Sequence, residues 1–262
     1  MKRRSFVKAT LTGSAGIFAG GVTAAPAVKK ERAEYYELRT YAFKNDAQQR
    51  LVEDYYQNAA IPALNRAGVK QVGVFSELSP AGRPRLFVLI PFNGLDHFAS
   101  VPDALKADTA YQQAATAYLQ APATAPAYER IESSLLRAFA HMPRLQAPPA
   151  IPRLFELRQY QSPGEASGQK KIEMFNDKGE IDIFKRLGFK PVFFAETLIG
   201  AARPNLTYMI TFDDMAGHDA HWKTFGSDPE WKQVSAIPEY ADALIISKIV
   251  STFITPTGYS QV

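Results

Sequence analysis

Two stretches of the chain carry the same chemically useful side chains in the same order. Residues 34–41 read EYYELRTY and residues 153–160 read RLFELRQY, so Glu-Leu-Arg-x-Tyr occurs twice. In a strand, alternate side chains lie on one face, which places a carboxylate, a guanidinium and a phenol side by side. Such a row can orient a small acidic or phenolic ligand, with tyrosine as a hydrogen-bond donor. The candidate ligand-binding residues are Glu37, Arg39, Tyr41, Glu156, Arg158 and Tyr160.

The same residue types also fit a purely structural role. Glu37 with Arg39, and Glu156 with Arg158, can form ion pairs that close two sheets against each other. Residue spacing does not separate this role from ligand binding, so both hypotheses stay open. No catalytic residue is assigned.

Histidines near position 220 raise the question of a metal site. His218 and His221 are three residues apart, a spacing that puts two imidazoles on one face of a helix, and Asp214 is near in sequence. The segment lacks the H-E-x-x-H pattern. We therefore expect no metal and keep His218 and His221 only as weak metal candidates. No cofactor is predicted, although haem ligation stays open for His97, His141, His218 and His221.

Other motifs favour structure over chemistry. In Asp228-Pro229-Glu230-Trp231 the acid fits a helix cap, the proline the first helical position, and the glutamate the positive end of the helix. The mature chain contains no G-x-S-x-G, G-x-G-x-x-G or P-loop pattern. These absences argue against a serine hydrolase and against a nucleotide-binding enzyme.

The elements that position these residues are predicted in the same order in both halves. Periodicity predicts strands at 34–42, 70–78, 85–92 and 131–139, with helices at 46–67 and 95–119. In the second half it predicts strands at 153–160, 191–198, 205–212 and 244–253, with helices at 169–187, 214–225 and 229–235. Matching segments such as RPRLFVLIPF (83–92) and RPNLTYMITF (203–212) indicate an internal duplication. Each half has the order βαββαβ of a ferredoxin-like unit.

The predicted fold class is α+β. The units span residues 34–140 and 153–256, joined by a Pro-rich linker at 141–152. A ferredoxin-like unit covers one sheet face with helices and leaves the other open, so two units in one chain can close into an α+β barrel with a cavity between the sheets. We expect Leu38 and Leu157 to face the helices and the Glu-Arg-Tyr rows to face this cavity.

The N-terminal segment predicts export. Residues 1–27 combine a cationic start, a mild apolar run and small residues ending in Ala-x-Ala, which is typical of a signal peptide. Arg3-Arg4-Ser5-Phe6-Val7-Lys8 resembles a twin-arginine leader, so the protein is expected in the periplasm or secreted, without a membrane anchor after cleavage. Much of the net charge of +4 belongs to this segment, and we predict no nucleic-acid partner. The chain has no cysteine, which excludes disulfides and thiolate metal sites.

Several of these segments together resemble the NIPSNAP family. They are the two Glu-Leu-Arg-x-Tyr openings, the Pro-x-Leu-x-Tyr strand, and Trp222-Lys-Thr-Phe225-Gly-Ser-Asp228-Pro229-Glu230-Trp231, which is degenerate in the first half as Asp108-Thr-Ala-Tyr111. The resemblance covers both units and implies the dimeric α+β barrel superfamily, which includes cofactor-free oxygenases, haem-degrading enzymes and isomerases. It implies no set of catalytic residues for this chain.

The expected function is binding of a small, partly apolar molecule in the inter-sheet cavity of an exported protein. One alternative is a cofactor-free oxygenase or isomerase that uses the Arg and Tyr side chains. Another is an adaptor whose surface helices bind protein partners. A monomer and a homo-oligomer both stay open, because a tandem chain can satisfy its own sheet faces, whereas members of the superfamily it resembles often associate further.

Overall fold

The structure, a computed structural model, describes residues 31–149, 151 and 153–262. The predicted export signal, residues 1–27, lies outside the described residues. Within them, no helix is long and apolar enough to cross a membrane. Arg32–Val262 form one compact unit by their contacts.

Each half of the chain supplies four strands and a set of helices. The first unit contains β1 (Tyr35–Ala42), α1 (Asp46–Tyr55), a π-helical turn (Tyr56–Ala60), α2 (Ile61–Arg66), β2 (Gly73–Glu77), β3 (Leu86–Phe92), α3 (Leu95–Ala107), α4 (Thr109–Ala114), α5 (Thr116–Leu119) and β4 (Arg130–Ala138). The second unit contains β5 (Leu154–Gln161), α6 (Glu165–Asn176), α7 (Glu180–Arg186), β6 (Lys190–Ile199), β7 (Asn205–Phe212), α8 (Met215–Ser227), α9 (Pro229–Ser235), a 3₁₀ turn (Pro238–Tyr240), α10 (Asp242–Ile245) and β8 (Lys248–Pro256). The predicted strand 244–253 is wrong at its start, because the chain is still helical there.

In the described residues, eight strands close into one antiparallel barrel in the order β1-β3-β2-β8-β5-β7-β6-β4. Within each unit the order is that of a ferredoxin-like sheet, and the units join through β2 with β8 and β4 with β6. Closure leaves neither sheet with an open edge. The predicted α+β barrel of two tandem units within one chain is confirmed.

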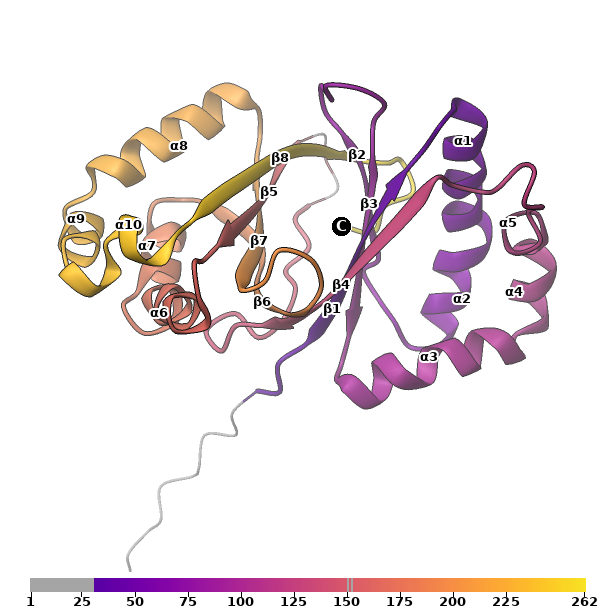
Figure 1. The fold of residues 1–262 in the computed structure, drawn as a ribbon, viewed down its shortest axis with the longest axis horizontal. Coiled ribbons are helices and arrows are strands. Elements are labelled where there is room, and N and C mark those ends of the chain that lie inside the picture. Colours follow the sequence, from indigo (N-terminus) through magenta and orange to yellow (C-terminus); the bar gives the residue numbers. More distant parts are fainter. Residues whose placement is uncertain (1–30, 150, 152) are drawn as a thin grey trace, which may run out of the picture. The chain divides into compact units, whose positions relative to one another are not determined.

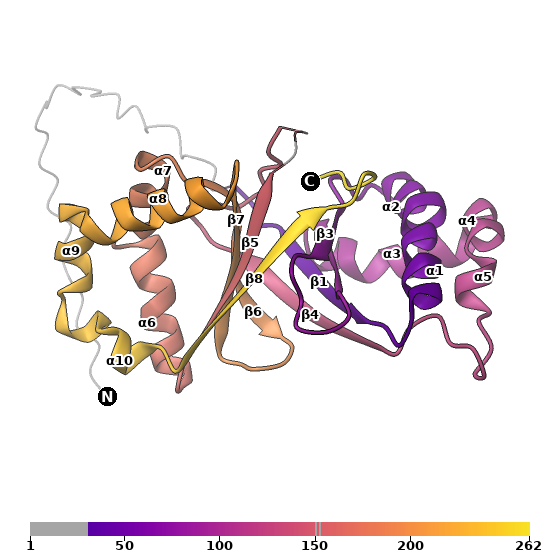
Figure 2. The same ribbon diagram turned by 90° about the horizontal axis from the view of Figure 1, so that it is seen from above.

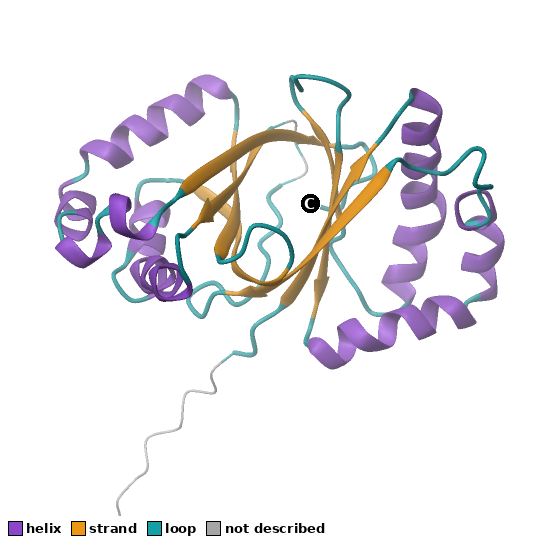
Figure 3. Ribbon diagram, viewed as in Figure 1, coloured by secondary structure: helices purple, strands orange, loops and turns teal. Residues whose placement is uncertain are grey.

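Helices cover the outside of the barrel in two separate groups. Figures 1 and 3 show α1–α5 against the strands of the first unit and α6–α10 against those of the second, with the strands between them; the view from above agrees (Figure 2). The barrel interior is packed with apolar side chains contributed by all eight strands. They include Tyr36, Phe75, Leu89, Leu136, Phe155, Phe193, Met209 and Ile254.

The prediction of which strand face meets the helices is wrong. Leu38 and Leu157 pack against the apolar cluster inside the barrel, whereas Tyr41 and Tyr160 belong to the clusters beneath the helices. Alternation along a strand separates two sets of side chains but does not say which set faces inward. The barrel interior is enclosed by sheet on both sides, so on β1 and β5 it takes the set without charged side chains. The Glu-Arg-Tyr rows therefore lie between sheet and helices, one row in each unit.

Two equivalent aspartates cap helices, one in each unit. The sequence predicts the cap in the second unit, and the structure confirms it. The Asp228 carboxylate accepts hydrogen bonds from the backbone N–H groups of Glu230 and Trp231 at the start of α9. Asp108 caps α4 in the same way, accepting from Tyr111. The distinctive sequence here marks a helix start.

Candidate functional site

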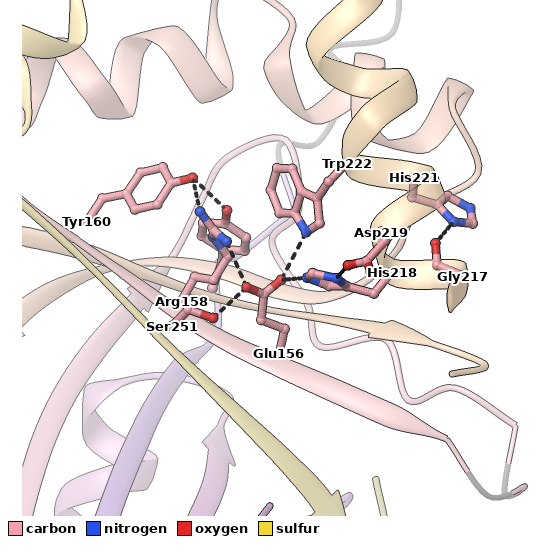
Figure 4. A network of polar contacts seen from close by, with 10 residues as sticks. Glu156, Arg158, Tyr160, Gly217, His218, Asp219, His221, Trp222 and Ser251 are labelled. Atoms are coloured by element: carbon pink, nitrogen blue, oxygen red, sulfur yellow. Dashed lines mark hydrogen bonds and ion pairs between the residues drawn. The ribbon is translucent and has the colours of Figure 1, made fainter. Parts of the chain in front are cut away.

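The second unit holds a closed polar network around Glu156 on β5 (Figure 4). The side chain is only 1% exposed, and its Oε1 accepts hydrogen bonds from Nη1 of Arg158 at 2.7 Å and from the Ser251 hydroxyl at 2.6 Å. Arg158 and Ser251 are direct partners in the pairing of β5 with β8. Sheet register thus places two donors on one oxygen of the carboxylate.

Two side chains of α8 reach the other oxygen of Glu156. Trp222 Nε1 donates to Oε2 at 3.1 Å, and its ring lies 4.4 Å from the Arg158 guanidinium carbon. His218 Nε2 lies 3.3 Å from Oε2, although its hydrogen-bond geometry is poor. Residues four apart share one face of a helix, which is why both reach the same carboxylate (Figure 4).

The first unit repeats the carboxylate, guanidinium and serine hydroxyl. Arg39 donates to both oxygens of Glu37, from Nε and Nη2, each at 2.8 Å. The Ser133 hydroxyl donates to Oε1 of Glu37 at 2.7 Å, and Ser133 pairs with Arg39 across β1 and β4. The predicted rows are therefore ion-paired in both units, beneath separate groups of helices rather than facing each other.

A tyrosine pair extends the network of the first unit. The hydroxyls of Tyr41 and Tyr56 lie 2.9 Å apart, and Nη1 of Arg39 donates to Tyr56 at 3.3 Å. Tyr56 begins the π-helical turn, in which Ile61 N–H bonds the carbonyl five residues back. Pro62 follows and has no N–H for the ordinary helical bond. The turn brings the neighbouring Tyr55 and Tyr56 to the same cavity.

A cavity of about 170 Å³ lies beneath the helices of the first unit. Its polar lining is Glu37, Arg39, Tyr55, Tyr56 and Tyr111. Its apolar lining includes Leu64, Ile90, Phe92, Phe98, Val101 and Leu105. An apolar wall with a few convergent polar groups is typical of a small-molecule site. A separate hollow of about 270 Å³ lies between the sheets of the two units, and its lining includes Leu38 and Leu157 as well as the polar side chains of Arg85, Glu132 and Gln159.

In the part of the chain that the structure describes, side-chain size explains why the equivalent place in the second unit is filled. α3 and α8 have the same length, and each is followed by a capping aspartate. Aligning them places small residues of the first unit opposite large ones of the second. The equivalent pairs are Leu64 and Phe184, Pro102 and Trp222, and Leu105 and Phe225. Bulky side chains fill in the second unit the space that stays open in the first.

Electrostatics fix the charge states in the cavity. Burial by itself would raise the pKa of the Glu37 carboxyl, but the hydrogen bonds and charge of Arg39, with the Ser133 hydroxyl, outweigh it and lower that pKa below 4.5. Burial raises the pKa of Tyr41, Tyr55 and Tyr56 above 10. At neutral pH the cavity therefore presents an ionised carboxylate, a guanidinium and neutral phenols.

The histidine candidates turn to different partners (Figure 4). His218 contacts Glu156 and, through Nδ1, Asp219 at 2.8 Å, whereas Nδ1 of His221 lies 2.7 Å from the Gly217 carbonyl. Asp214 caps α8 instead of facing them. Over the described ranges, no group of three or more His, Cys, Asp or Glu side chains is arranged to hold a metal.

Several participants were not singled out from the sequence. Ser133 and Ser251 lie in strands that match between the halves, but pairing with an arginine needs the strand register. Trp222 was noted only as part of a family-like segment. Alignment of the two helices places it opposite Pro102, and this difference between halves was the available signal.

Comparison with sequence families decides the classification. The NIPSNAP profile matches twice, over residues 36–143 and 155–261. The chain belongs to the NIPSNAP family. The two NIPSNAP matches fall on the two structural units, so the duplication seen in the fold is a duplication of this domain. A comparison with curated proteins found no significant match.

Solved structures share the fold of this NIPSNAP protein at low sequence identity. A candidate monooxygenase from Fusobacterium nucleatum is similar at 12% identity and a TM-score of 0.57, over 86% of this chain and 93% of that one. An anthrone oxidase-like protein is similar at 9% identity and a TM-score of 0.52, over 87% and 93%. A NIPSNAP family protein of unknown function from Agrobacterium tumefaciens has 17% identity and a TM-score of 0.35, over 40% of this chain and 88% of that one.

Proposed function

We propose that this NIPSNAP protein binds a small, largely apolar molecule in the cavity beneath the helices of its first unit. The observation that carries the proposal is the Glu37–Arg39 ion pair, which lines an otherwise mostly apolar space of about 170 Å³. A protein tolerates a partly buried charge pair at such a wall when further hydrogen bonds satisfy it. The ion pair gives a ligand polar partners at one end of an apolar pocket.

The size of the cavity limits the ligand. An engineered apolar cavity of about 150 Å³ binds benzene or xenon, and the cavity here is about 170 Å³. It suits a molecule with one or two rings or a short branched chain. The inter-sheet position expected from the sequence has its own hollow of about 270 Å³, and we favour the cavity under the helices because an ion pair with satisfied hydrogen bonds meets a mostly apolar wall there.

An oxygenase or isomerase without a cofactor is the enzymatic alternative, and its proton-abstracting form needs a general base at the ligand. The lowered pKa of Glu37 makes this carboxylate a weak base, and the raised pKa values of Tyr41, Tyr55 and Tyr56 keep these phenols protonated. The charge states favour holding and orienting a molecule over removing its proton. Similarity of fold to a candidate monooxygenase does not transfer that activity.

Native mass spectrometry of the protein, produced with its own leader, tests the proposal. The expected result is a small-molecule adduct that disappears on denaturation. Pro102→Trp, which introduces on α3 the residue that α8 carries, should remove the adduct. Ala104→Trp adds the same bulk at an exposed position of α3 and should keep it. Bare protein in every sample, together with no thermal stabilisation by saturating benzene, contradicts the proposal.

We also propose export through the twin-arginine pathway to the periplasm or outside. Support comes from Arg3-Arg4 ahead of a mild apolar run and small residues. That pathway carries folded proteins, so a ligand bound during folding in the cytoplasm would be exported with its carrier.

A further inference from the structure

In the second unit, a side chain of the protein itself fills the place that is an open cavity in the first unit. Trp222 projects from α8 at the position that Pro102 holds on α3. Four side chains around its indole have equivalents that line the first-unit cavity. Glu156, Arg158, Phe184 and Phe225 correspond to Glu37, Arg39, Leu64 and Leu105.

The contacts of this indole define a complementary chemistry. Its N–H donates to Oε2 of Glu156 at 3.1 Å, and its ring face lies 4.4 Å from the Arg158 guanidinium carbon. The rings of Phe184 and Phe225 stand nearly perpendicular to the indole, each at 5.7 Å between ring centroids, and the ring of Phe189 lies at 5.2 Å. One carboxylate acceptor, one stacked cation and apolar rings thus surround a planar aromatic group.

The first unit keeps the acceptor but has no equivalent of the two α8 side chains that approach it. The two side chains that reach Oε2 of Glu156 are Trp222 and His218. Their equivalents are Pro102 and Phe98, and neither carries a side-chain N–H or O–H. Two bonds from Arg39 and one from Ser133 account for the contacts of the Glu37 carboxylate in the described part of the chain. An ionised carboxylate accepts about four hydrogen bonds, so Glu37 has room for one more donor.

We propose that the first-unit cavity binds a neutral planar aromatic molecule with a ring N–H or O–H group, of the indole or phenol type. The group donates to Glu37, and the ring lies against the Arg39 guanidinium. The inference rests on the proposed function and names the ligand class for that site. A carboxylic acid fits less well, because Glu37 already neutralises Arg39 and would repel a second anion.

The test uses the full mature protein and three ligands of nearly equal shape: indole, benzofuran and indene. Calorimetric titration measures the affinity of each. Only indole donates a hydrogen bond, so we expect one site that prefers indole by about tenfold or more, since a bond to a charged acceptor discriminates strongly. Pro102→Trp should abolish binding of all three. Glu37→Gln should reduce the preference to about threefold or less, because a neutral amide is a weaker acceptor.

Other outcomes separate this inference from the proposed function. Suppose that the natural protein binds indole and benzofuran with equal affinity and that Pro102→Trp binds neither. This result overturns the ligand class but leaves a small-molecule site in place. Binding of benzene without binding of indole likewise overturns the ligand class and leaves a small-molecule site in place. If indole, benzofuran, indene and benzene all fail to bind, the ligand class and the proposed function both fall.

Discussion

Trp222 Nε1 donates a hydrogen bond of 3.1 Å to Oε2 of Glu156, a carboxylate that is 1% exposed. Pro102, in the same position of the first unit, offers no such donor to Glu37, which is 12% exposed. The duplicated chain has thus kept one arrangement of carboxylate, guanidinium and serine in two states, one covered by its own tryptophan and one beside a cavity.

Replacement of Trp222 should lower stability in two distinguishable steps. Trp222→Phe keeps much of the bulk but removes the N–H from a buried carboxylate, and we expect a loss of about 1–3 kcal/mol in the free energy of unfolding. Trp222→Ala also leaves a void, which raises the expected loss to about 3–5 kcal/mol. Lys223→Ala, at an exposed neighbouring position, should stay within about 0.5 kcal/mol. Urea titration measures all three, and equal stabilities would show that the indole is not part of the packing.

Arg158 should contribute mainly to stability, and Arg39 mainly to ligand binding. Arg158→Met leaves the nearly inaccessible Glu156 without its cation, and about 3–5 kcal/mol of stability should be lost. Arg39 is 29% exposed, so Arg39→Met should cost less stability and mainly weaken ligand binding. Thermal unfolding and indole titration on both variants make the comparison. Similar losses of stability with unchanged indole affinity would assign both pairs a structural role.

The architecture could be predicted from the sequence more completely than the candidate site could. Repeated strand and helix patterns in the same order were enough to predict two ferredoxin-like units and their closure into a barrel. The structure reverses the predicted inward and outward faces of β1 and β5. The spacing of Glu37, Arg39 and Tyr41 places these residues on one face of the strand, but it does not show whether that face points into the barrel or toward the helices. The tyrosine rings of the Glu-Arg-Tyr rows pack beneath the helices as well as the leucine side chains would have done.

Partners contributed by distant strands and helices were harder to predict. Ser133 and Ser251 meet their carboxylates through strand register, which no local pattern encodes. The cavity depends on differences in volume between equivalent positions, as with Leu64 and Phe184. Such differences become informative only after the two units are superposed in register.

Acid should remove the contribution of Glu37 to stability. The folded-state pKa of this carboxyl is lowered below 4.5, so the stabilisation is complete above about pH 4.5 and is lost as the pH falls through the folded-state value. The difference in unfolding free energy between the natural protein and Glu37→Gln should therefore be constant from pH 6 to 8 and shrink below pH 4.5. Denaturant titration at a series of pH values measures it. A difference that stays constant down to pH 3 would disprove this linkage.

Export should depend on the paired arginines near the N-terminus. Replacement of both Arg3 and Arg4 by lysine keeps the charge but removes the twin-arginine pattern, and the protein should then remain in the cytoplasm at its precursor mass. Lys2→Arg is the matched control and should be exported. Cell fractionation followed by intact-mass analysis measures both. Normal export of the Arg3→Lys, Arg4→Lys variant would point to a different route.

A crystal structure of the mature protein soaked with indole tests the central claim most directly. The account predicts one indole in the first-unit cavity, with its nitrogen within hydrogen-bond distance of Glu37 and its ring against Arg39, and none in the second unit, where Trp222 already lies. Indole bound only elsewhere, or a first-unit cavity closed by rearranged side chains, would contradict it.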